Sequence, residues 1–342
     1  MSEGQKNLDW PERSRVIRAL GGSKDHAGAV RALEALLQKD PDPRARIDAA
    51  VALGQLGGPD ATALLVEKAG STDDSDVRGA ALGAIETSGD PSAVPGLINL
   101  FRLNRGLRGP NDVVGHDDDA IVHLGASHAL LKIGAPGVPQ LLQALNDPSA
   151  KVRWAVVYLL GEMGNPEVAG RALGNSQDHA VVVRALGAVL RHDPDREVRV
   201  FAARSLGQLR GPDALALLVE KLTSTDEAYV RGAALFAIET SHDPSAIEGL
   251  VSIFRLNRGH DDPEAQIEAS QALVKIGAPG VPQLLQALND PSANVRRAVV
   301  DVLGKIGNAE VADRITGLQT DPDPAVRKAV EGALATLKAT KH

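Results

Sequence analysis

The sequence of 342 residues contains no cysteine. This absence excludes disulfide bonds, thiolate metal sites and cysteine-based catalysis, and it suits a chain that folds in a reducing compartment. Aromatic residues are nearly absent too, at 2% of the chain, although 43% of the residues are hydrophobic. The core must therefore be built from Ala, Leu, Val and Ile, small side chains that favour closely stacked helices over large sheets.

Long apolar runs and an excess of positive charge are also missing. No segment approaches the roughly 18 consecutive apolar residues of a membrane span, and the N-terminal MSEGQKNLDWPERSR has no apolar signal segment. With a formal net charge of −7, the chain lacks the broad basic face that general nucleic-acid binding needs. We therefore expect a soluble, cytoplasmic protein that binds neither a membrane nor nucleic acid.

The sequence does contain an internal duplication. Residues 77–106 and 230–259 match at 23 of 30 positions with an offset of 153. The segment KIGAPGVPQLLQALNDPSA occurs unchanged at 132–150 and at 275–293, with an offset of 143. The difference arises mainly at 107–115 (LRGPNDVVG), which only the first half carries. An insertion of this kind projects from one edge of a repeat array, and we hypothesise that it gates or extends a binding surface.

A shorter repeat lies within each half. Segments such as DPSAKVRWAVVYLLGEMGN (147–165) and DPSANVRRAVVDVLGKIGN (290–308) share an Asp-Pro start, a Val-Arg pair, an Ala- and Val-rich stretch and a final glycine. Asp or Ser before Pro predicts the N-cap and first residue of a helix, and the final glycine predicts its left-handed C-terminal stop. Each repeat is therefore expected to form two antiparallel helices.

The first helix of each repeat carries an apolar stripe at helical spacing. Residues at i, i+3, i+4 and i+7 form it, and in one repeat they are Val152, Ala155, Val156, Leu159 and Met163. One hairpin cannot bury this stripe, so neighbouring repeats must stack on one another. The pattern predicts nine such first helices, beginning near residues 43, 74, 119, 149, 195, 227, 263, 292 and 323.

These repeats divide the chain into four predicted parts. An N-terminal helical cap covers 1–40, a first array covers 41–164, its duplicate covers 165–321, and a capping helix with a tail covers 322–342. The pattern resembles the HEAT-repeat family, in particular the bacterial and archaeal HEAT-like repeats of the phycobilisome-lyase type. The resemblance implies an all-α, right-handed solenoid with first helices on the convex side. It also implies that the chain is a protein-interaction scaffold, as most members of the family are.

Two enzymatic relatives keep other functions open. Some HEAT-like proteins attach bilins to phycobiliproteins, and deoxyhypusine hydroxylase is a di-iron enzyme built from two symmetrical HEAT halves. That enzyme holds iron with His-Glu pairs, and this chain contains no His-Glu dipeptide. An unsymmetrical metal site would need the cluster His116, Asp117, Asp118, Asp119 and His123, for which a capped helix start beside a loop is the simpler interpretation. We therefore predict no metal, no cofactor and no catalytic residue.

A basic residue recurs at one position of the first helices. Because it lies near the helix N-terminus, where the helix dipole disfavours a cation, the recurrence predicts pairing with the Asp residues of the inter-repeat turns. The alternative is a row of ligand-binding side chains. This predicted structural ladder consists of Arg46, Arg78, Arg153, Arg199, Arg231, Arg296 and Arg327.

Two further sets are candidate partner-binding residues. Trp154 and Tyr158 lie four residues apart on a first helix, and the second half has Arg297 and Asp301 in their place. Positions that accept charged residues are expected to be partly exposed, and exposed aromatic residues are favoured interface anchors; packing against a neighbouring repeat is the alternative.

The second set comes from the duplicated FRLNRG segment, in which arginines end a second helix. These side chains are expected either to favour the helix dipole or to form two basic half-sites for acidic segments or phosphates. The residues are Arg102, Arg105, Arg255 and Arg258. Together, these observations predict a non-enzymatic scaffold that presents a curved surface to a protein or peptide; a phycobilin lyase-like factor and a metal-dependent hydroxylase are the alternatives.

Overall fold

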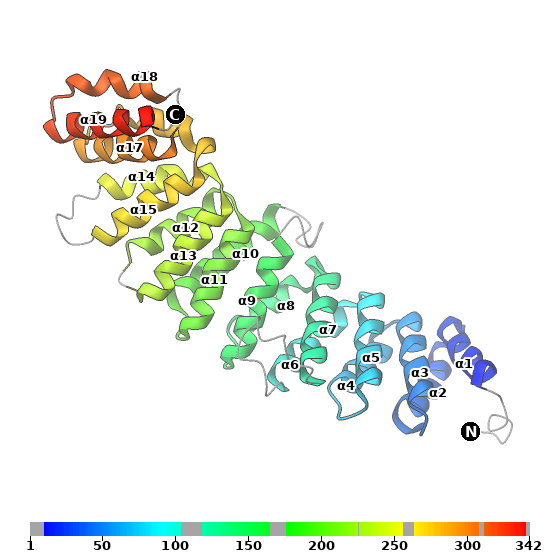
Figure 1. Cartoon of the computed structure of the whole chain (residues 1–342). Coiled ribbons are helices and arrows are strands. Elements are labelled where there is room, and N and C mark those ends of the chain that lie inside the picture. Colours follow the sequence, from blue (N-terminus) through cyan, green and yellow to red (C-terminus); the bar gives the residue numbers. More distant parts are fainter. Residues whose placement is uncertain are drawn as a thin grey trace. The chain divides into compact units, whose positions relative to one another are not determined.

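The computed structural model describes residues 10–103, 118–164, 176–224, 226–255, 263–307 and 311–339. All regular structure in these ranges is helical, as predicted (Figure 1). The chain forms two compact units, Met1–His179 and Ala180–His342. The four-part division drawn from the sequence stays a prediction. No helix within the described ranges is both long and apolar enough to cross a membrane.

The first unit begins with two helices and continues as hairpins. The two helices are α1 (Trp10–Ala19) and α2 (His26–Lys39). The first helices of the following hairpins are α3 (Pro43–Leu56), α5 (Ser75–Ser88), α7 (Asp118–Ile133) and α9 (Ala150–Gly164). Their second helices are α4 (Pro59–Ala69), α6 (Val94–Leu103) and α8 (Val138–Ala144).

The second unit repeats this arrangement. After α10 (Ser176–His192), which begins just before the unit does, the first helices are α11 (Arg196–Leu209), α13 (Ala228–Ser241), α15 (Pro263–Ile276), α17 (Ala293–Ile306) and α19 (Pro324–Ala339). The second helices are α12 (Pro212–Leu222), α14 (Ile247–Arg255), α16 (Val281–Ala287) and α18 (Val311–Thr316). All nine first helices start within one residue of the predicted positions, which confirms the repeat pattern.

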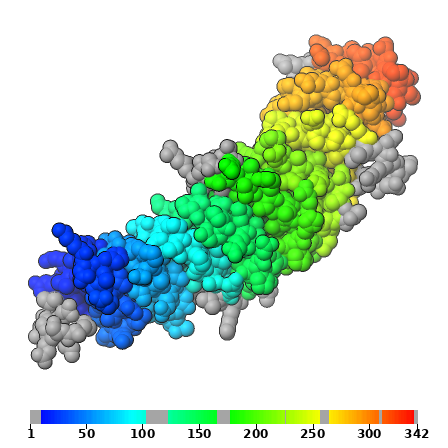
Figure 2. Space-filling view, turned by 180° about the vertical axis from the view of Figure 1, so that it is seen from behind, coloured from blue at the N-terminus to red at the C-terminus, as the bar shows by residue number. Residues whose placement is uncertain are grey.

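Chain order and spatial order agree within each unit. In Figure 2 the colours of each unit follow one another in sequence, so each hairpin contacts its sequence neighbours. The core is made of small aliphatic side chains, and the predicted stripe on α9 is buried throughout. Phe101, Phe201 and Phe254 are the aromatic residues of this core among the described residues.

Glycines inside the first helices allow the closest helix contacts. The final glycines of the repeats are predicted to end helices, which is correct for Gly57 and Gly307 with φ of 66° and 79°. Gly54, Gly207 and Gly304 instead lie within helices and face an alanine of the next first helix. A Cβ at Gly207 would lie 2.8 Å from the Cβ of Ala237. These glycines are needed because the two helix backbones approach too closely for any side chain between them.

The Asp-Pro pairs prove to be turn residues at several junctions rather than helix starts. The N-cap of α11 is Asp195 and that of α17 is Ser292, each two residues after the aspartate of an Asp-Pro pair. The connection between hairpins needs these extra residues to reach the next helix. The Asp290 carboxylate accepts the backbone N–H of Ser292 at 2.9 Å, so it organises the turn that precedes the helix. The predicted N-cap role is correct at Asp42, which precedes Pro43.

The recurrent arginines of the first helices connect successive turns. Arg296 donates from Nη1 to the backbone oxygen of Asp290 at 2.8 Å. Its Nε and Nη2 donate to the two carboxylate oxygens of Asp321, in the next turn, at 2.8 and 2.9 Å. Arg46 makes the same two contacts with Asp40 and Asp73, at 2.7 and 3.0 Å. A guanidinium suits this position because its planar donors reach a carbonyl and a carboxylate together.

Other members of the predicted ladder make related contacts. Arg199 donates to the backbone oxygen of Asp193 at 2.8 Å and to the Asp226 carboxylate at 3.2 Å. Arg231 donates to the Asp226 backbone oxygen at 2.9 Å and to Glu264 at 2.7 Å. Backbone oxygens of the inter-repeat turns also accept from the remaining partners: Asp147 from Arg153, and Asp321 from Arg327. Arg78 is buried. We propose that these contacts give the ladder a structural role.

The first prediction concerns the close contact between α11 and α13. Replacing Gly207→Ala is expected to lower the free energy of unfolding by about 1–3 kcal/mol, because the new methyl group forces the helices apart. Gly232→Ala is the matched control, since a Cβ there meets nothing within 4 Å. It should raise stability by up to about 1 kcal/mol through helix propensity. Urea unfolding followed by circular dichroism measures both, and equal stabilisation by the two variants would refute the packing argument.

The second prediction concerns the ion pair of Asp321. The hydrogen bond from Arg296 holds the pKa of this carboxyl below its ordinary value of 3.8, although burial opposes the shift. The ionised carboxylate therefore contributes stability that is complete above pH 3.8 and is lost as the pH falls through the lowered pKa. Asp321→Asn should cost about 1–3 kcal/mol at neutral pH.

The measurement is urea unfolding of wild type and variant between neutral and acidic pH. The difference in unfolding free energy should shrink on acidification below the ordinary carboxyl pKa. Asp313→Asn is the matched control, because Asp313 is exposed on α18. A cost for Asp321→Asn that does not depend on pH would contradict the assigned ion pair.

Candidate functional site

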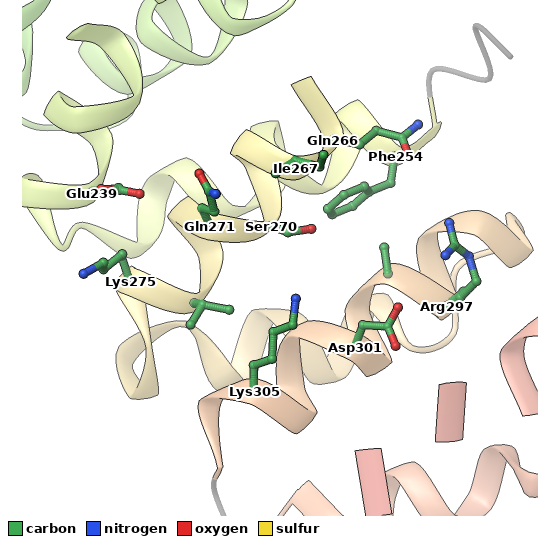
Figure 3. A pocket seen from close by; sticks show the side chains of 12 residues that line it. Glu239, Phe254, Gln266, Ile267, Ser270, Gln271, Lys275, Arg297, Asp301 and Lys305 are labelled. Atoms are coloured by element: carbon green, nitrogen blue, oxygen red, sulfur yellow. The ribbon is translucent and has the colours of Figure 1, made fainter. Parts of the chain in front are cut away.

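A groove lies on the second unit between the first helices α15 and α17 (Figure 3). Its volume is about 640 Å³, which is within the range of ligand sites. Helix α15 forms one wall and α17 the other, while α14 and α13 each contribute one side chain. The lining residues are Glu239, Phe254, Gln266, Ile267, Ser270, Gln271, Val274, Lys275, Arg297, Ala298, Asp301 and Lys305.

The groove combines an apolar surface with charged walls. Ile267 is 57% exposed, whereas Phe254 and Ala298 are buried beneath the groove. Lys275, Arg297 and Lys305 form no ion pair within 4 Å among the described residues. Ile267 therefore leaves apolar surface exposed beside cations that make no close ion pair in the described part of the chain.

Asp301 lies on α17 between two of these cations. Loss of hydration in the groove raises the pKa of its carboxyl, and the positive charges of Arg297 and Lys305 oppose the shift. The side chain is exposed at the surface and yet partly surrounded by protein, as expected for a residue on the wall of an open groove.

The predicted partner-binding pair Trp154 and Tyr158 lies on α9 of the first unit. Both side chains are half-buried, and their rings stack with centroids 6.5 Å apart and an interplanar angle of 13°. Burial raises the pKa of the Tyr158 hydroxyl, and the charge of Glu162 adds to this effect. The expected partial exposure is thus present, while binding to a partner stays a proposal.

The duplication relates this pair to the groove of the second unit. Trp154 and Tyr158 correspond to Arg297 and Asp301, and the exposed Leu124 corresponds to Ile267. His123, the counterpart of Gln266, contacts Phe101 edge-on with ring centroids 4.8 Å apart. Equivalent helix faces of the two units therefore carry different types of side chain. Sequence reasoning missed Ile267 and Lys305, although aligning the two halves at these positions would have identified them.

The arginines of the FRLNRG segments pair with aspartates of the inter-repeat turns. Arg102 donates to the buried Asp147 carboxylate and to Asn99. Arg255 donates to the buried Asp290 carboxylate from Nε at 2.8 Å and from Nη2 at 2.6 Å. Both arginine side chains remain about half exposed. Each guanidinium therefore has a carboxylate within this chain to pair with. Binding of another protein by these arginines stays a proposal.

Several other predictions fall on residues outside the described ranges. These include Arg105, Arg258, the insertion 107–115, and His116 with Asp117 from the acidic cluster. Among the residues that the structure describes, no three His, Asp or Glu side chains lie close enough together to hold a metal ion.

The third prediction tests whether the exposed Ile267 on α15 contributes to the stability of the fold. Ile267→Thr should change the free energy of unfolding by less than about 0.5 kcal/mol, because the side chain is 57% exposed. The matched control, Ile276→Thr at the end of the same helix, should cost about 1–3 kcal/mol because Ile276 is buried. Thermal and urea unfolding measure both. A large cost at Ile267 would show that the folded unit itself requires this side chain.

Comparisons with known proteins place this geometry in context. A family model for HEAT repeats matches residues 5–86, 167–239, 183–258 and 247–335, and a single HEAT-repeat model matches 138–165. Phycocyanobilin lyase subunit beta from Nostoc sp. is 32% identical over 117 residues, which cover 34% of this chain and 56% of that protein. The chain thus spans little more than half the length of this relative.

Two further proteins are similar over longer regions. Deoxyhypusine hydroxylase from Eremothecium gossypii is 25% identical over 225 residues, covering 58% of this chain and 67% of that one. The solved structure of Kap121p bound to Pho4p has a TM-score of 0.46 and 14% identity, and the match covers 98% of this chain and 40% of that one. Since the HEAT-repeat model matches most of the sequence, the chain belongs to the HEAT-repeat family.

Proposed function

We propose that this chain is a non-enzymatic scaffold that binds a protein or peptide partner. The observation that supports this most strongly is the exposure of large apolar side chains on the first helices. Leu124, Tyr229, Phe236 and Ile267 are between 46% and 58% exposed, and they lie on α7, α13 and α15. Because folding does not bury these side chains, contact with a partner is the interaction that would remove them from water.

The architecture supplies the rest of the support. Stacked hairpins present a long row of first helices, each of which can carry a different set of surface residues without altering the core. The groove at α15 and α17 adds a concave feature of about 640 Å³ on this row. Its side chains are apolar, amide, hydroxyl and charged, a mixture that suits recognition of a peptide by shape and charge.

A second candidate function is attachment of a bilin chromophore. The similarity to phycocyanobilin lyase subunit beta, 32% over 117 residues, is the observation that favours it. The chain would be purified from cells that also synthesise phycocyanobilin, and its visible absorbance would be measured. A protein that binds or transfers the chromophore would show the absorption band of the pigment, whereas a protein scaffold would not. For a hydroxylase of the deoxyhypusine type, metal analysis of the purified chain is the corresponding test.

The fourth prediction tests the scaffold function with the intact chain. Affinity capture from the native source is expected to recover a stoichiometric protein partner with wild type. The combined variant Trp154→Ala, Tyr158→Ala, Arg102→Ala and Arg255→Ala should lose it, because truncating interface anchors typically costs about 2 kcal/mol or more each.

The control for this experiment lies on the last helix. Lys328→Ala with Glu331→Ala changes two exposed residues of α19 and should retain the partner. Retention of the partner by all variants would show that these surfaces do not bind it. Recovery of metal or pigment without any protein partner would contradict the scaffold function and favour an enzymatic one.

A further inference from the structure

The two units contain copies of one helix face that differ along a single stripe. These copies are α9 and α17. Outside the stripe, their residues are identical or are exchanged for similar apolar residues, except that Asn294 replaces Lys151. The differing positions are spaced by four residues, so they lie on one side of the helix. In α9 the stripe is Trp154, Tyr158 and Glu162; in α17 it is Arg297, Asp301 and Lys305.

The segments that lead into α9 and α17 are preserved. Residues 132–150 and 275–293 are identical, and they contain all of α8 and all of α16. The buried alanines beside the stripe, Ala155 and Ala298, are also the same. The core has therefore kept its shape while every stripe position has changed charge or aromatic character. Helix α15, which forms the other wall of the groove, also differs from its counterpart α7, since Ile267 and Gln266 replace Leu124 and His123. The stripe and the wall opposite it have therefore changed together, over the same core.

The stripe of α17 forms one wall of the groove in the second unit. Figure 3 shows Lys305 and Phe254 pointing into the space between α15 and α17, opposite Ser270. Three cations line the groove, Lys275, Arg297 and Lys305, against the two carboxylates of Glu239 and Asp301. This local positive excess occurs on a chain whose formal net charge is −7. The lining thus carries an excess of one positive charge, which favours a negatively charged ligand at this place on an acidic chain.

The dimensions of the groove indicate the shape of the ligand. The lining residues of α15 extend from Gln266 to Lys275, which is about 14 Å at the rise of an α-helix. Those of α17 extend over a similar length, from Arg297 to Lys305. Two helical walls of this length match about two to three turns of a third helix. Such a helix places side chains at i, i+3 and i+4 toward the apolar surface at Ile267.

We propose that the groove between α15 and α17 binds an acidic amphipathic helix of a partner protein, and that the α17 stripe determines this preference. The proposal rests on the scaffold function and names the class of partner for one surface. An apolar side chain of the ligand covers Ile267, and its carboxylates pair with Arg297 and Lys305. The corresponding face of the first unit carries Trp154, Tyr158 and Glu162 and does not bind the same ligand.

The fifth prediction uses two synthetic 14-residue helical peptides with the same pattern, one of Leu and Glu and one of Leu and Lys. The full chain, labelled at Ile, Leu and Val methyl groups, is titrated with each peptide and observed by NMR. The Leu-Glu peptide should shift the methyl signals of Ile267 and Val274 at concentrations up to about 1 mM. The Leu-Lys peptide should bind at least about tenfold more weakly, because it places cations beside cations.

Variants then assign the selectivity to the stripe. The triple variant Arg297→Trp, Asp301→Tyr and Lys305→Glu installs the residues of the first unit, which fit the same flanking sequence. It should weaken binding of the Leu-Glu peptide on the order of tenfold. Arg297→Gln with Lys305→Gln removes only charge and should act in the same direction. Arg314→Gln with Lys328→Gln, on exposed residues of α18 and α19, should leave the affinity unchanged.

Three outcomes would overturn the proposal. The first is equal binding of both peptides, or no binding of either one. The second is binding that persists unchanged in both stripe variants while circular dichroism shows that they are folded. The third is a shift of the Ile267 signal with protein concentration alone, which would assign the groove to a second copy of this chain. The scaffold function would survive the first two outcomes, because partner capture tests it separately.

Discussion

The stack of first helices depends on how closely one helix backbone can approach the next. The aliphatic stripe of a repeat is made of small side chains, and these bury their surface only when neighbouring helices lie nearly in contact. Gly54, Gly207 and Gly304 permit this approach, since each lies against an alanine of the following first helix. The scarcity of aromatic residues follows from the same constraint, because a bulky ring at these contacts would separate the repeats.

The turns on which the first helices begin provide a second, directional set of contacts. An arginine such as Arg296 joins the backbone oxygen of its own turn to the carboxylate of the next one. Hydrophobic stacking alone does not specify the register of neighbouring helices, whereas a planar donor between two fixed acceptors does. Core and turns are therefore constrained, and the outward stripe of each first helix is left as the surface on which repeats can differ.

The duplication shows what the fold tolerates at individual positions. The helix ends formed by Gly57 and Gly89 in the first half are formed by Arg210 and His242 in the second, which also adopt positive φ of 57° and 49°. The hydrogen bonds of the following turn hold this conformation, as Asp243 accepts the backbone N–H of Gly211 at 3.2 Å. At the stripe positions, by contrast, Trp154 and Arg297 are both accepted without any change of backbone conformation class. The positive φ is thus kept at the turn positions in both halves, whereas the side chains differ at the surface positions of the stripe.

The sequence by itself determined the all-helical class, the nine first helices and the apolar stripe, because helical periodicity and stop residues act locally. It misplaced several Asp-Pro pairs and did not identify the glycines within helices as contact points, since these roles depend on what the next repeat brings near them. The pairing of Arg102 with Asp147, residues far apart in the chain, likewise follows from stacking. Only the tertiary structure could join Ile267, Arg297 and Lys305 into one groove, because that surface exists only where α15 and α17 meet over α14.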